Sequence, residues 1–501
     1  MGHNSYKFEF VLVFIVTFFI FIPMFLLYPV DLDQTWNYQF ARRIICGQVP
    51  YRDFNIIVTP LSAQLNALLI TIFPDEMIVL RWEGALIAAL NACIIYIILR
   101  KYLNIKLVIS LFILTLFVMV VNVWPQNNYS WTSVLFLSLA MLFEYKYSDN
   151  IHDSSANIYV FIIGIILGIV TIIKHNIGIA GLLCSLVLSI VNFRLYSVNR
   201  SISVSQLLQQ IWLKLAGWFV IVVIELLYLW QHNALSAFID FTISGMGSYT
   251  NRSYLPYSHL VKDFYNNINA FSVLIPIALL SLLLKFSNFC ERVKKGPYAL
   301  IFFYSIANFS LIYPISDTTH LALAAPLSLI ATAVILNELK IKHDISKGIY
   351  VSLAGMVVIS VCISIYKSSE GHFVRGQELR HYKYLPISQE KIKLIKGIDD
   401  FIVDTESKGK HVYMLDPRAS YFMIPIDKFN HKYDPMNAGN FGTKGIQEVL
   451  NSLSSEKNLV VLVRGEKLSP NWLEQKEFID YAKNNMKFVK SLELFDVYDK
   501  L

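Results

Sequence analysis

The chain has 501 residues, of which 55% are hydrophobic and only 16% are charged, and its formal net charge is +7. A soluble globular protein carries roughly 25% charged residues, so this composition excludes an ordinary soluble domain and predicts a polytopic membrane protein. The positive charge is not interleaved with exposed aromatic side chains, which argues against nucleic-acid binding.

Apolar segments predict a mainly α-helical bundle of about 11 membrane spans, because a spanning helix needs roughly 20 apolar residues. The predicted spans are 8–28, 77–99, 107–123, 130–146, 157–173, 177–195, 211–230, 268–286, 297–315, 319–338 and 348–366. They define a transmembrane module over residues 1–366. Residues 367–501 are more polar and are predicted to form a small soluble α/β domain.

Charged loops set the predicted orientation, since Lys and Arg accumulate on the cytoplasmic side. With the N-terminus inside, the basic loops face the cytoplasm, whereas the loops after Val123 and Ile315 carry no Lys or Arg. The short apolar segment Thr59–Phe73 would reverse this pattern if it crossed, so we expect it to lie in the interface as an amphipathic helix. The first outer loop, residues 30–76, and the C-terminal domain are then extracytoplasmic.

Ionisable residues next to apolar helices collect on this predicted outer side. Such residues cost free energy and tend to be functional, so we expect them to line one cavity. They are Asp31, Asp33, Arg52 and Asp53 in the first outer loop, Lys174 and His175 between spans five and six, Tyr249 and Arg252 after span seven, and Asp317 and His320 before span ten.

Asp31 and Asp33 follow the first span directly. In an extended segment, side chains two residues apart point the same way, so the pair could hold a divalent metal such as Mg²⁺ or Mn²⁺. One carboxylate could instead be a general base whose pKa is raised by partial burial. The alternative is that the helix exit simply carries solvated aspartates.

Lys174 and His175 have two interpretations as well. A lysine is a compact charge suited to a phosphate, but it could also extend toward lipid headgroups. Arg52 and Asp53 could pair only within their loop. Asp317 could be only a helix cap.

The first outer loop has a recognisable pattern. It is an Asp after span one, then a run ending in Ala41-Arg42-Arg43, then Gly47, Pro50-Tyr51-Arg52-Asp53-Phe54 and Pro60-Leu61. This pattern resembles the GT-C superfamily of membrane glycosyltransferases, most closely the bacterial relatives of protein O-mannosyltransferases and of the lipid A aminoarabinose transferase (glycosyltransferase family 39-like). Two positions depart from it: Gln34 replaces an acidic residue, and Thr59 replaces a proline.

The resemblance implies an enzyme of the EC 2.4 class in a bacterial inner membrane. It would move a sugar from a polyprenyl-phosphate carrier to a lipid, glycan or protein acceptor on the outer face. Asp33 matches the catalytic Asp of the family by its distance from the Ala41-Arg42-Arg43 run, and Asp31 would assist. Lys174, with His175 or Arg252, would contact the donor phosphate.

The C-terminal domain shows strand and helix patterns. His411–Leu415, Asn458–Val463 and Phe488–Tyr498 are predicted strands, and Ser388–Thr405 and Pro470–Asn485 are predicted helices. We assign this domain to acceptor handling or lid support. Asp416-Pro417-Arg418 follows a strand, where α/β domains often bind ligands, although a plain loop explains it too.

Two other membrane functions remain open. A lipid-linked oligosaccharide flippase or transporter predicts charges deep inside spans and repeated halves; Glu225 is the clearest deep charge and no repeat is evident. A polysaccharide polymerase or ligase would not need an acidic loop after span one. A non-catalytic scaffold would leave the outer polar residues without a purpose.

Overall fold

The computed structural model describes residues 3–27, 29–30, 32–56, 58–102, 129–149, 156–197, 203–246, 254–262, 270–289, 297–338, 373–432, 441–464 and 474–500. The chain divides into two compact units. We call Met1–Phe25, Glu83–Glu225 and Tyr254–Ile365 the helical unit. We call Leu26–Trp82, Leu226–Ser253 and Tyr366–Leu501 the mixed unit. The predicted spans 107–123 and 348–366 lie outside the described residues.

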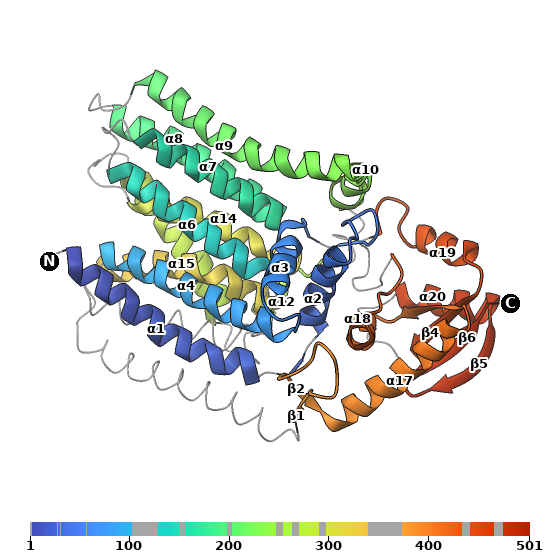
Figure 1. The fold of residues 1–501 in the computed structure, drawn as a ribbon. Helices are drawn as coiled ribbons and strands as arrows, with labels where there is room; N and C mark the ends of the chain where they lie inside the picture. The colour runs from blue at the N-terminus through green and yellow to red at the C-terminus, as the bar shows by residue number, and fades with distance from the viewer. Residues whose placement is uncertain are drawn as a thin grey trace. The chain divides into compact units, whose positions relative to one another are not determined.

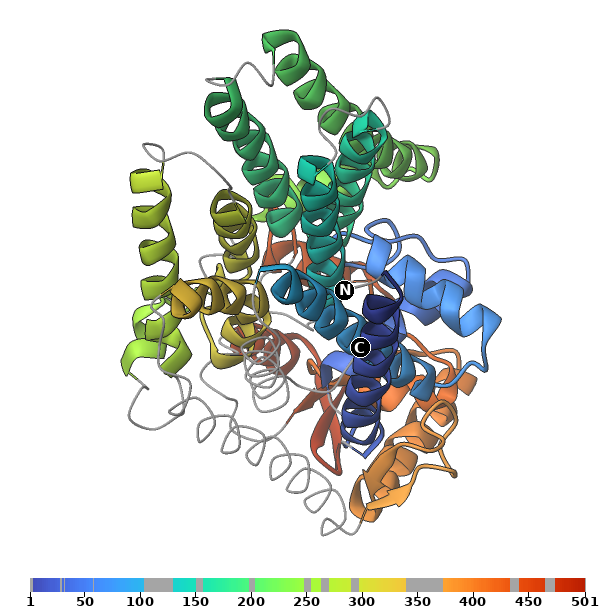
Figure 2. The same cartoon turned by 90° about the vertical axis from the view of Figure 1, so that its left-hand side faces the viewer.

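The described part of the helical unit is built from long apolar helices. Figures 1 and 2 show α6, α7 and α8 side by side, and α14 packs on α8 and on α15. The helices with most of their residues in this unit are α1 (His3–Leu27), α4 (Ile78–Tyr102), α6 (Tyr129–Asp149), α7 (Ala156–Ile173), α8 (His175–Ser197), α9 (Val204–Gln231), α12 (Ser258–Lys262), α13 (Ala270–Phe289), α14 (Pro297–Phe309), the 3₁₀ turn η3 (Ser310–Ile312) and α15 (Thr318–Glu338).

Each predicted span inside the described residues coincides with a helix. Among the residues that the structure describes, four helical segments are long and apolar enough to cross a membrane, namely Ile78–Arg100, Ala156–Ile173, His175–Arg194 and Val204–Gln231. The last of these, α9, has 28 residues, or about 42 Å of helix against a hydrocarbon core of about 30 Å. Trp212 and Trp230 are exposed near its two ends, as tryptophans are at membrane interfaces. The protein is an integral membrane protein.

Glycines allow α7 and α9 to touch through their backbones. A Cβ atom on Gly164 would lie 2.2 Å from the carbonyl oxygen of Lys214, and one on Gly217 would lie 2.4 Å from that of Phe161. Small residues permit such close approach between membrane helices. Larger side chains at either glycine would therefore force the two helices apart.

A buried ion pair joins helices of the helical unit. Lys214 Nζ on α9 donates to Glu144 Oε1 on α6 at 2.5 Å, to Ser189 Oγ at 2.8 Å and to the Ser185 carbonyl oxygen at 3.1 Å on α8. Both charged side chains are only 2% exposed. The sequence analysis singled out Glu225 as the clearest deep charge and did not identify the Glu144–Lys214 pair. Both members of this pair lie near the ends of their predicted spans.

The mixed unit combines short helices with two small sheets. Its described elements are α2 (Leu32–Ile45), α3 (Leu61–Ile72), α10 (Leu235–Ile239), the π-helical turn η1 (Asp240–Ser244), β1 (Phe373–Arg375), β2 (Pro386–Ser388), α17 (Gln389–Ser407), β3 (His411–Leu415), α18 (Ala419–Met423), the 3₁₀ turn η4 (Ile424–Ile426), α19 (Ile446–Ser455), β4 (Leu459–Arg464), α20 (Glu474–Asn485), β5 (Lys487–Leu492) and β6 (Phe495–Asp499). The helix expected at Thr59–Phe73 is α3; its position at a membrane surface stays a prediction.

The larger sheet has the strand order β3-β4-β6-β5. β3 pairs with β4 in parallel, and both are almost entirely buried, as expected for continuous apolar runs. β6 pairs antiparallel with both β4 and β5. β5 is the edge strand; its lysines and a register shift near Phe488 discourage pairing with another chain. The predicted strands are therefore confirmed, and Phe488–Tyr498 covers parts of two of them.

One hydrophobic core joins the first loop to the C-terminal segment of the mixed unit. Tyr38 and Ala67 pack in the same buried cluster as Tyr382 and Phe422. Backbone bonds support this association: three amides within residues 30–77 donate to carbonyl oxygens of the C-terminal segment. These bonds are Val30 to Pro386 at 3.3 Å, Asn55 to Lys432 at 3.0 Å and Met77 to His381 at 3.1 Å.

Candidate active site

The predicted base Asp33 lies in the first turn of α2 and is exposed. Its backbone carbonyl oxygen accepts a hydrogen bond from Asn37 Nδ2 at 2.9 Å. Because α2 begins at Leu32, the extended geometry expected for the Asp31–Asp33 segment does not hold at Asp33. The N-terminus of a helix carries a partial positive charge, which stabilises a carboxylate there.

Gln34, where the resembling family has an acidic residue, is buried beside a buried arginine. Gln34 Oε1 accepts a hydrogen bond from Arg81 Nη2, and the same nitrogen donates to the Pro29 carbonyl oxygen at 3.1 Å. Arg81 is fully buried. The departure at position 34 therefore gives an amide–guanidinium contact in place of an ion pair.

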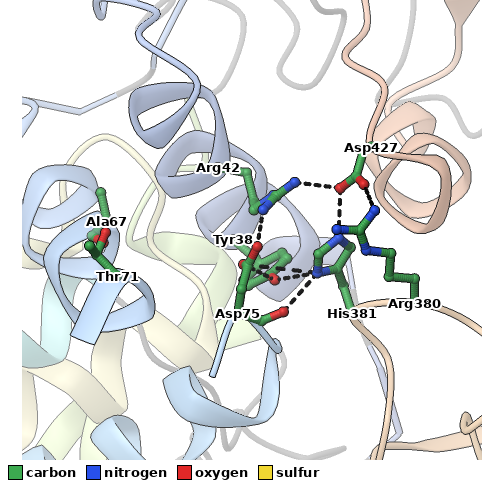
Figure 3. Close-up of polar contacts among 8 residues, drawn as sticks. All are labelled: Tyr38, Arg42, Ala67, Thr71, Asp75, Arg380, His381 and Asp427. Carbon is green, nitrogen blue, oxygen red and sulfur yellow. Dashed lines mark hydrogen bonds and ion pairs between the residues drawn. The ribbon is translucent and has the colours of Figure 1, made fainter. Parts of the chain in front are cut away.

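A polar network connects α2 to the C-terminal segment within the mixed unit. Figure 3 shows Tyr38 and Arg42 projecting from α2 toward His381 and Asp427. Arg42 forms ion pairs with both Asp75 and Asp427. His381 Nε2 lies 2.7 Å from Asp427 Oδ1, and its Nδ1 lies 2.8 Å from the Tyr38 hydroxyl. Tyr38 in turn donates to Asp75 Oδ1 at 2.7 Å.

Both ring nitrogens of His381 face oxygen atoms. Nε2 faces Asp427 Oδ1, and Nδ1 lies 2.8 Å from both the Tyr38 hydroxyl and the Asp75 carbonyl oxygen. Burial lowers the pKa of His381 and the Asp427 hydrogen bond opposes this, with Arg42 adding to the decrease. Burial alone would raise the pKa of Asp427, but the bond from His381 and the charges of Arg42 and Arg380 bring it below its ordinary value. Asp427 is therefore ionised near neutral pH.

Arg52 and Asp53 pair with each other. Arg52 Nε lies 2.9 Å from Asp53 Oδ1 and Nη2 lies 2.7 Å from Oδ2. Asp53 Oδ2 also accepts from the Val49 amide at 2.7 Å. The Arg52 hydrogen bond lowers the pKa of Asp53, against an opposing effect of burial. Arg52 Nη1 also donates to the His232 carbonyl oxygen at 3.2 Å. The pair therefore has bonds both inside and outside its loop, and its role in a site stays a prediction.

Lys174 occupies the turn between α7 and α8 in the helical unit. Its Nζ donates to Ser130 Oγ at 3.0 Å and lies 5.0 Å from the centre of the Tyr129 ring. Burial lowers the pKa of Lys174 to about 8, and the charge of Asp317 opposes the decrease. Within the described part of the chain, no carboxylate lies within ion-pair distance of this nitrogen. The ammonium is therefore held by neutral groups and can accept an anionic ligand.

The residues next to Lys174 show how this turn is built. Asp317 Oδ1 accepts from the His320 amide at 2.7 Å and lies 2.8 Å from His320 Nδ1, so Asp317 caps α15. His175 is the first residue of α8. Its Nδ1 and the amide oxygen of Asn176 are buried and have no hydrogen-bond partner among the described residues. Unsatisfied buried polar atoms cost free energy and are available to a ligand.

Several predicted site residues cannot be placed together. Asp31, Tyr249 and Arg252 lie outside the described residues. Asp33 belongs to the mixed unit and Lys174 to the helical unit, so a common pocket stays a prediction. Among the residues that the structure covers, no group of three or more His, Cys, Asp or Glu side chains has a metal-ligating arrangement. These residues do not fit a metal site, and a metal at Asp31 and Asp33 stays a prediction.

The fold of this chain is shared with solved structures. A bundle of long apolar helices, in a chain that also has a mixed α/β unit containing the loop after the first helix, occurs in two crystal structures. The similarity is one of fold, and it agrees with the resemblance predicted from the first outer loop.

Two crystal structures carry this assignment. ArnT from Cupriavidus metallidurans bound to undecaprenyl phosphate has a TM-score of 0.61 and 11% identity, over 100% of this chain and 99% of that chain. The Archaeoglobus fulgidus oligosaccharyltransferase in complex with Zn and sulfate has a TM-score of 0.51 and 14% identity, over 90% of this chain and 68% of that chain. No protein-family model and no curated protein sequence matches this chain.

The sequence pointed to none of the partners of Tyr38 and Arg42. Asp75 follows α3, whereas His381 and Asp427 lie in turns of the C-terminal segment. Their one available signal was the Ala41-Arg42-Arg43 run: two consecutive arginines at the end of a mostly buried helix require acceptors. Finding those acceptors required the tertiary structure.

Proposed function

We propose that this chain is an integral-membrane glycosyltransferase that moves a sugar from a polyprenyl-phosphate carrier to an acceptor on the outer face of a bacterial inner membrane. Asp33 is the general base, Lys174 contacts the carrier phosphate, and the anomeric configuration is inverted. The acceptor is a hydroxyl-bearing lipid, glycan or protein.

The proposed reaction is a single displacement. Asp33 takes the proton of the acceptor hydroxyl while the acceptor oxygen bonds to the anomeric carbon. The bond from that carbon to the phosphate oxygen breaks, and the polyprenyl phosphate leaves with the electron pair. Lys174 offsets the negative charge that grows on the departing phosphate, which is where preorganised charge is most effective.

The observation that carries the proposal is the full-length similarity to ArnT, a structure that holds undecaprenyl phosphate. Local geometry supports it in two places. Asp33 is exposed at the positive end of α2, where a carboxylate can meet a substrate. Lys174 is bonded to a neutral hydroxyl, so its charge is not compensated by a described ion pair.

The direct test uses the purified protein in nanodiscs with undecaprenyl-phosphate-linked radiolabelled sugars and bacterial membrane lipids as acceptors. We expect release of undecaprenyl phosphate by the wild type. Asp33→Asn should reduce the rate by about 10²–10⁴-fold, the usual contribution of general acid–base catalysis. Absence of release by the wild type across a panel of sugar donors would contradict the proposal.

A matched control separates this effect from a general loss of charge. Asp404 is exposed on α17 and pairs with Lys408, so Asp404→Asn should keep the wild-type rate.

For the phosphate contact, Lys174→Ala should weaken binding of undecaprenyl phosphate. Unchanged affinity of that variant would remove Lys174 from the site. A chelator added to the wild type tests for a metal at Asp31 and Asp33.

The alternative functions are a lipid-linked oligosaccharide flippase or transporter, and a polysaccharide polymerase or ligase. The Glu144–Lys214 pair is buried, as charges in a transporter often are, although both residues lie near the ends of their predicted spans. However, the Lys214 ammonium already makes three hydrogen bonds to protein groups, which suits a fixed structural contact better than a transport path. Lipid movement without sugar transfer would favour the flippase.

A further inference from the structure

The N-terminal half of α2 is held by one small region of the C-terminal segment. Trp36 Nε1 donates to the Pro417 carbonyl oxygen at 2.9 Å. Thr35 Oγ1 lies 2.8 Å from Ser420 Oγ, and both of these side chains are fully buried. α18, which contains Ser420, packs against α2. These contacts are two and three residues from Asp33.

The turn that supplies the Pro417 carbonyl is itself fixed by a buried carboxylate. Asp416 is fully buried at the end of β3. Its Oδ1 accepts from the Arg418 amide at 2.7 Å and from Arg418 Nε at 3.1 Å, and its Oδ2 accepts from Nη2 at 3.1 Å. With these bonds, Asp416 closes the turn around Pro417. These bonds give Asp416-Pro417-Arg418 a structural role; ligand binding at this turn stays a prediction.

These bonds form a continuous chain from the sheet to the helix that bears the candidate base. Strand β3 ends at Leu415, the carboxylate of the following Asp416 shapes the turn, and the turn binds Trp36. Because a helix transmits a displacement of one turn to the next, a shift at Trp36 moves Asp33. Misplacement of a catalytic group by about 1 Å can cost about 10²-fold in rate.

We propose that Trp36, Thr35, Ser420 and the Asp416–Arg418 turn are positioning residues, through which the C-terminal segment sets the location of Asp33. The proposal rests on the proposed function. It gives the C-terminal segment a part in catalysis itself, in addition to any handling of the acceptor.

Two substitutions remove the hydrogen bonds while keeping most of the side-chain volume in the core. Trp36→Phe keeps an aromatic ring but loses the donor, and Ser420→Ala removes the hydroxyl opposite Thr35. For the double variant we expect kcat for undecaprenyl phosphate release to fall about 10- to 100-fold, while KM for the sugar-carrying lipid stays within twofold. Asp416→Asn, which alters a residue without a described contact to α2, should lower kcat in the same way.

Hydrogen exchange provides a readout that does not depend on activity. The backbone amides of α2 should exchange faster in the double variant, whereas those of α17 should not change. The control is Glu378→Gln, which breaks the exposed pair with Lys396 in the same unit and should leave kcat and exchange at wild-type values.

The outcomes separate the two proposals. If the wild type releases no undecaprenyl phosphate, the proposed function fails, and the exchange of α2 still reports on the contacts. If the wild type is active and Asp33→Asn is not, but the double variant keeps both the wild-type kcat and the wild-type exchange of α2, the positioning proposal is overturned. The proposal is also overturned if kcat falls only in proportion to the amount of folded protein while KM is unchanged, because the loss then reflects unfolding.

Discussion

The two units differ in how far their paired charged side chains are buried. In the helical unit, Glu144 and Lys214 are each 2% exposed and meet among apolar helices. In the mixed unit, Arg42 meets Asp75 and Asp427, whose side chains are 33% and 28% exposed. Water can replace a lost partner at the second site but not at the first. Folding therefore depends more on the ion pair in the helical unit than on the ion pairs in the mixed unit.

The largest effect is expected where water has no access. Lys214→Met leaves Glu144 buried without its countercharge, and breaking such a pair costs about 3–5 kcal/mol. We expect the variant to unfold at a much lower fraction of dodecyl sulfate than the wild type. The double variant Glu144→Gln with Lys214→Met should recover most of the loss, because no unpaired charge remains. Equal unfolding of wild type and single variant would show that the pair contributes nothing.

A smaller effect on stability is expected in the mixed unit, where pH changes the charge of His381. The pKa of His381 is lowered in the folded protein, chiefly by burial, so folding favours its neutral form. Its contribution to stability is present above the unfolded pKa of about 6.5 and is lost as pH falls below that value. We expect the wild type to lose more unfolding free energy than His381→Asn between about pH 7 and pH 5.

Wild type and His381→Asn must be compared because other groups also affect the pH dependence of stability. Burial raises the pKa of Asp399 to about 8, so its contribution decreases as pH rises, with the opposite sign. His431, whose pKa burial lowers to about 4, acts in the same direction as His381. Both occur in wild type and variant and cancel. Parallel pH curves for the two proteins would exclude a role of His381.

The smallest effect is expected at a fully solvated pair. Lys396 and Glu378 form an ion pair with side chains 47% and 60% exposed, and exposed pairs contribute little to stability. Glu378→Gln should therefore leave the unfolding transition in dodecyl sulfate unchanged. A measurable decrease would mean that exposure is a poor guide to the contribution of ion pairs in this unit, and would weaken the comparison.

Local pattern was sufficient for most elements of the fold. The continuous apolar runs at His411–Leu415 and Asn458–Val463 predicted β3 and β4, because strands buried on both faces need no alternation. The amphipathic pattern of Ser388–Thr405 predicted α17. By contrast, α18 is only five residues long, and packing on α2 rather than helix propensity decides its conformation. No local pattern could reveal it.

The candidate site shows the same limit. Asp33 and Lys174 were noticed because charges beside apolar helices are unusual, and the choice of Asp33 as base came from the family resemblance of the first outer loop; both arguments need only nearby residues. Tyr38 and His381 lie 343 positions apart, and Glu144 and Lys214 lie 70 apart. Single sequences carry no information about such pairings. The arginines of α2 indicated that acceptors exist but not where they lie.

The shared core of the mixed unit has a consequence for biosynthesis. The first loop leaves the ribosome long before Leu379, Tyr382 and Phe422, against which it packs. At about 5–20 residues per second, translating the 343 positions between Tyr38 and His381 takes roughly 20 to 70 seconds. During this interval α2, which bears Asp33, can pack on α3 but lacks the contacts that the C-terminal segment supplies. A nascent or truncated chain therefore carries the proposed base without the framework that orients it.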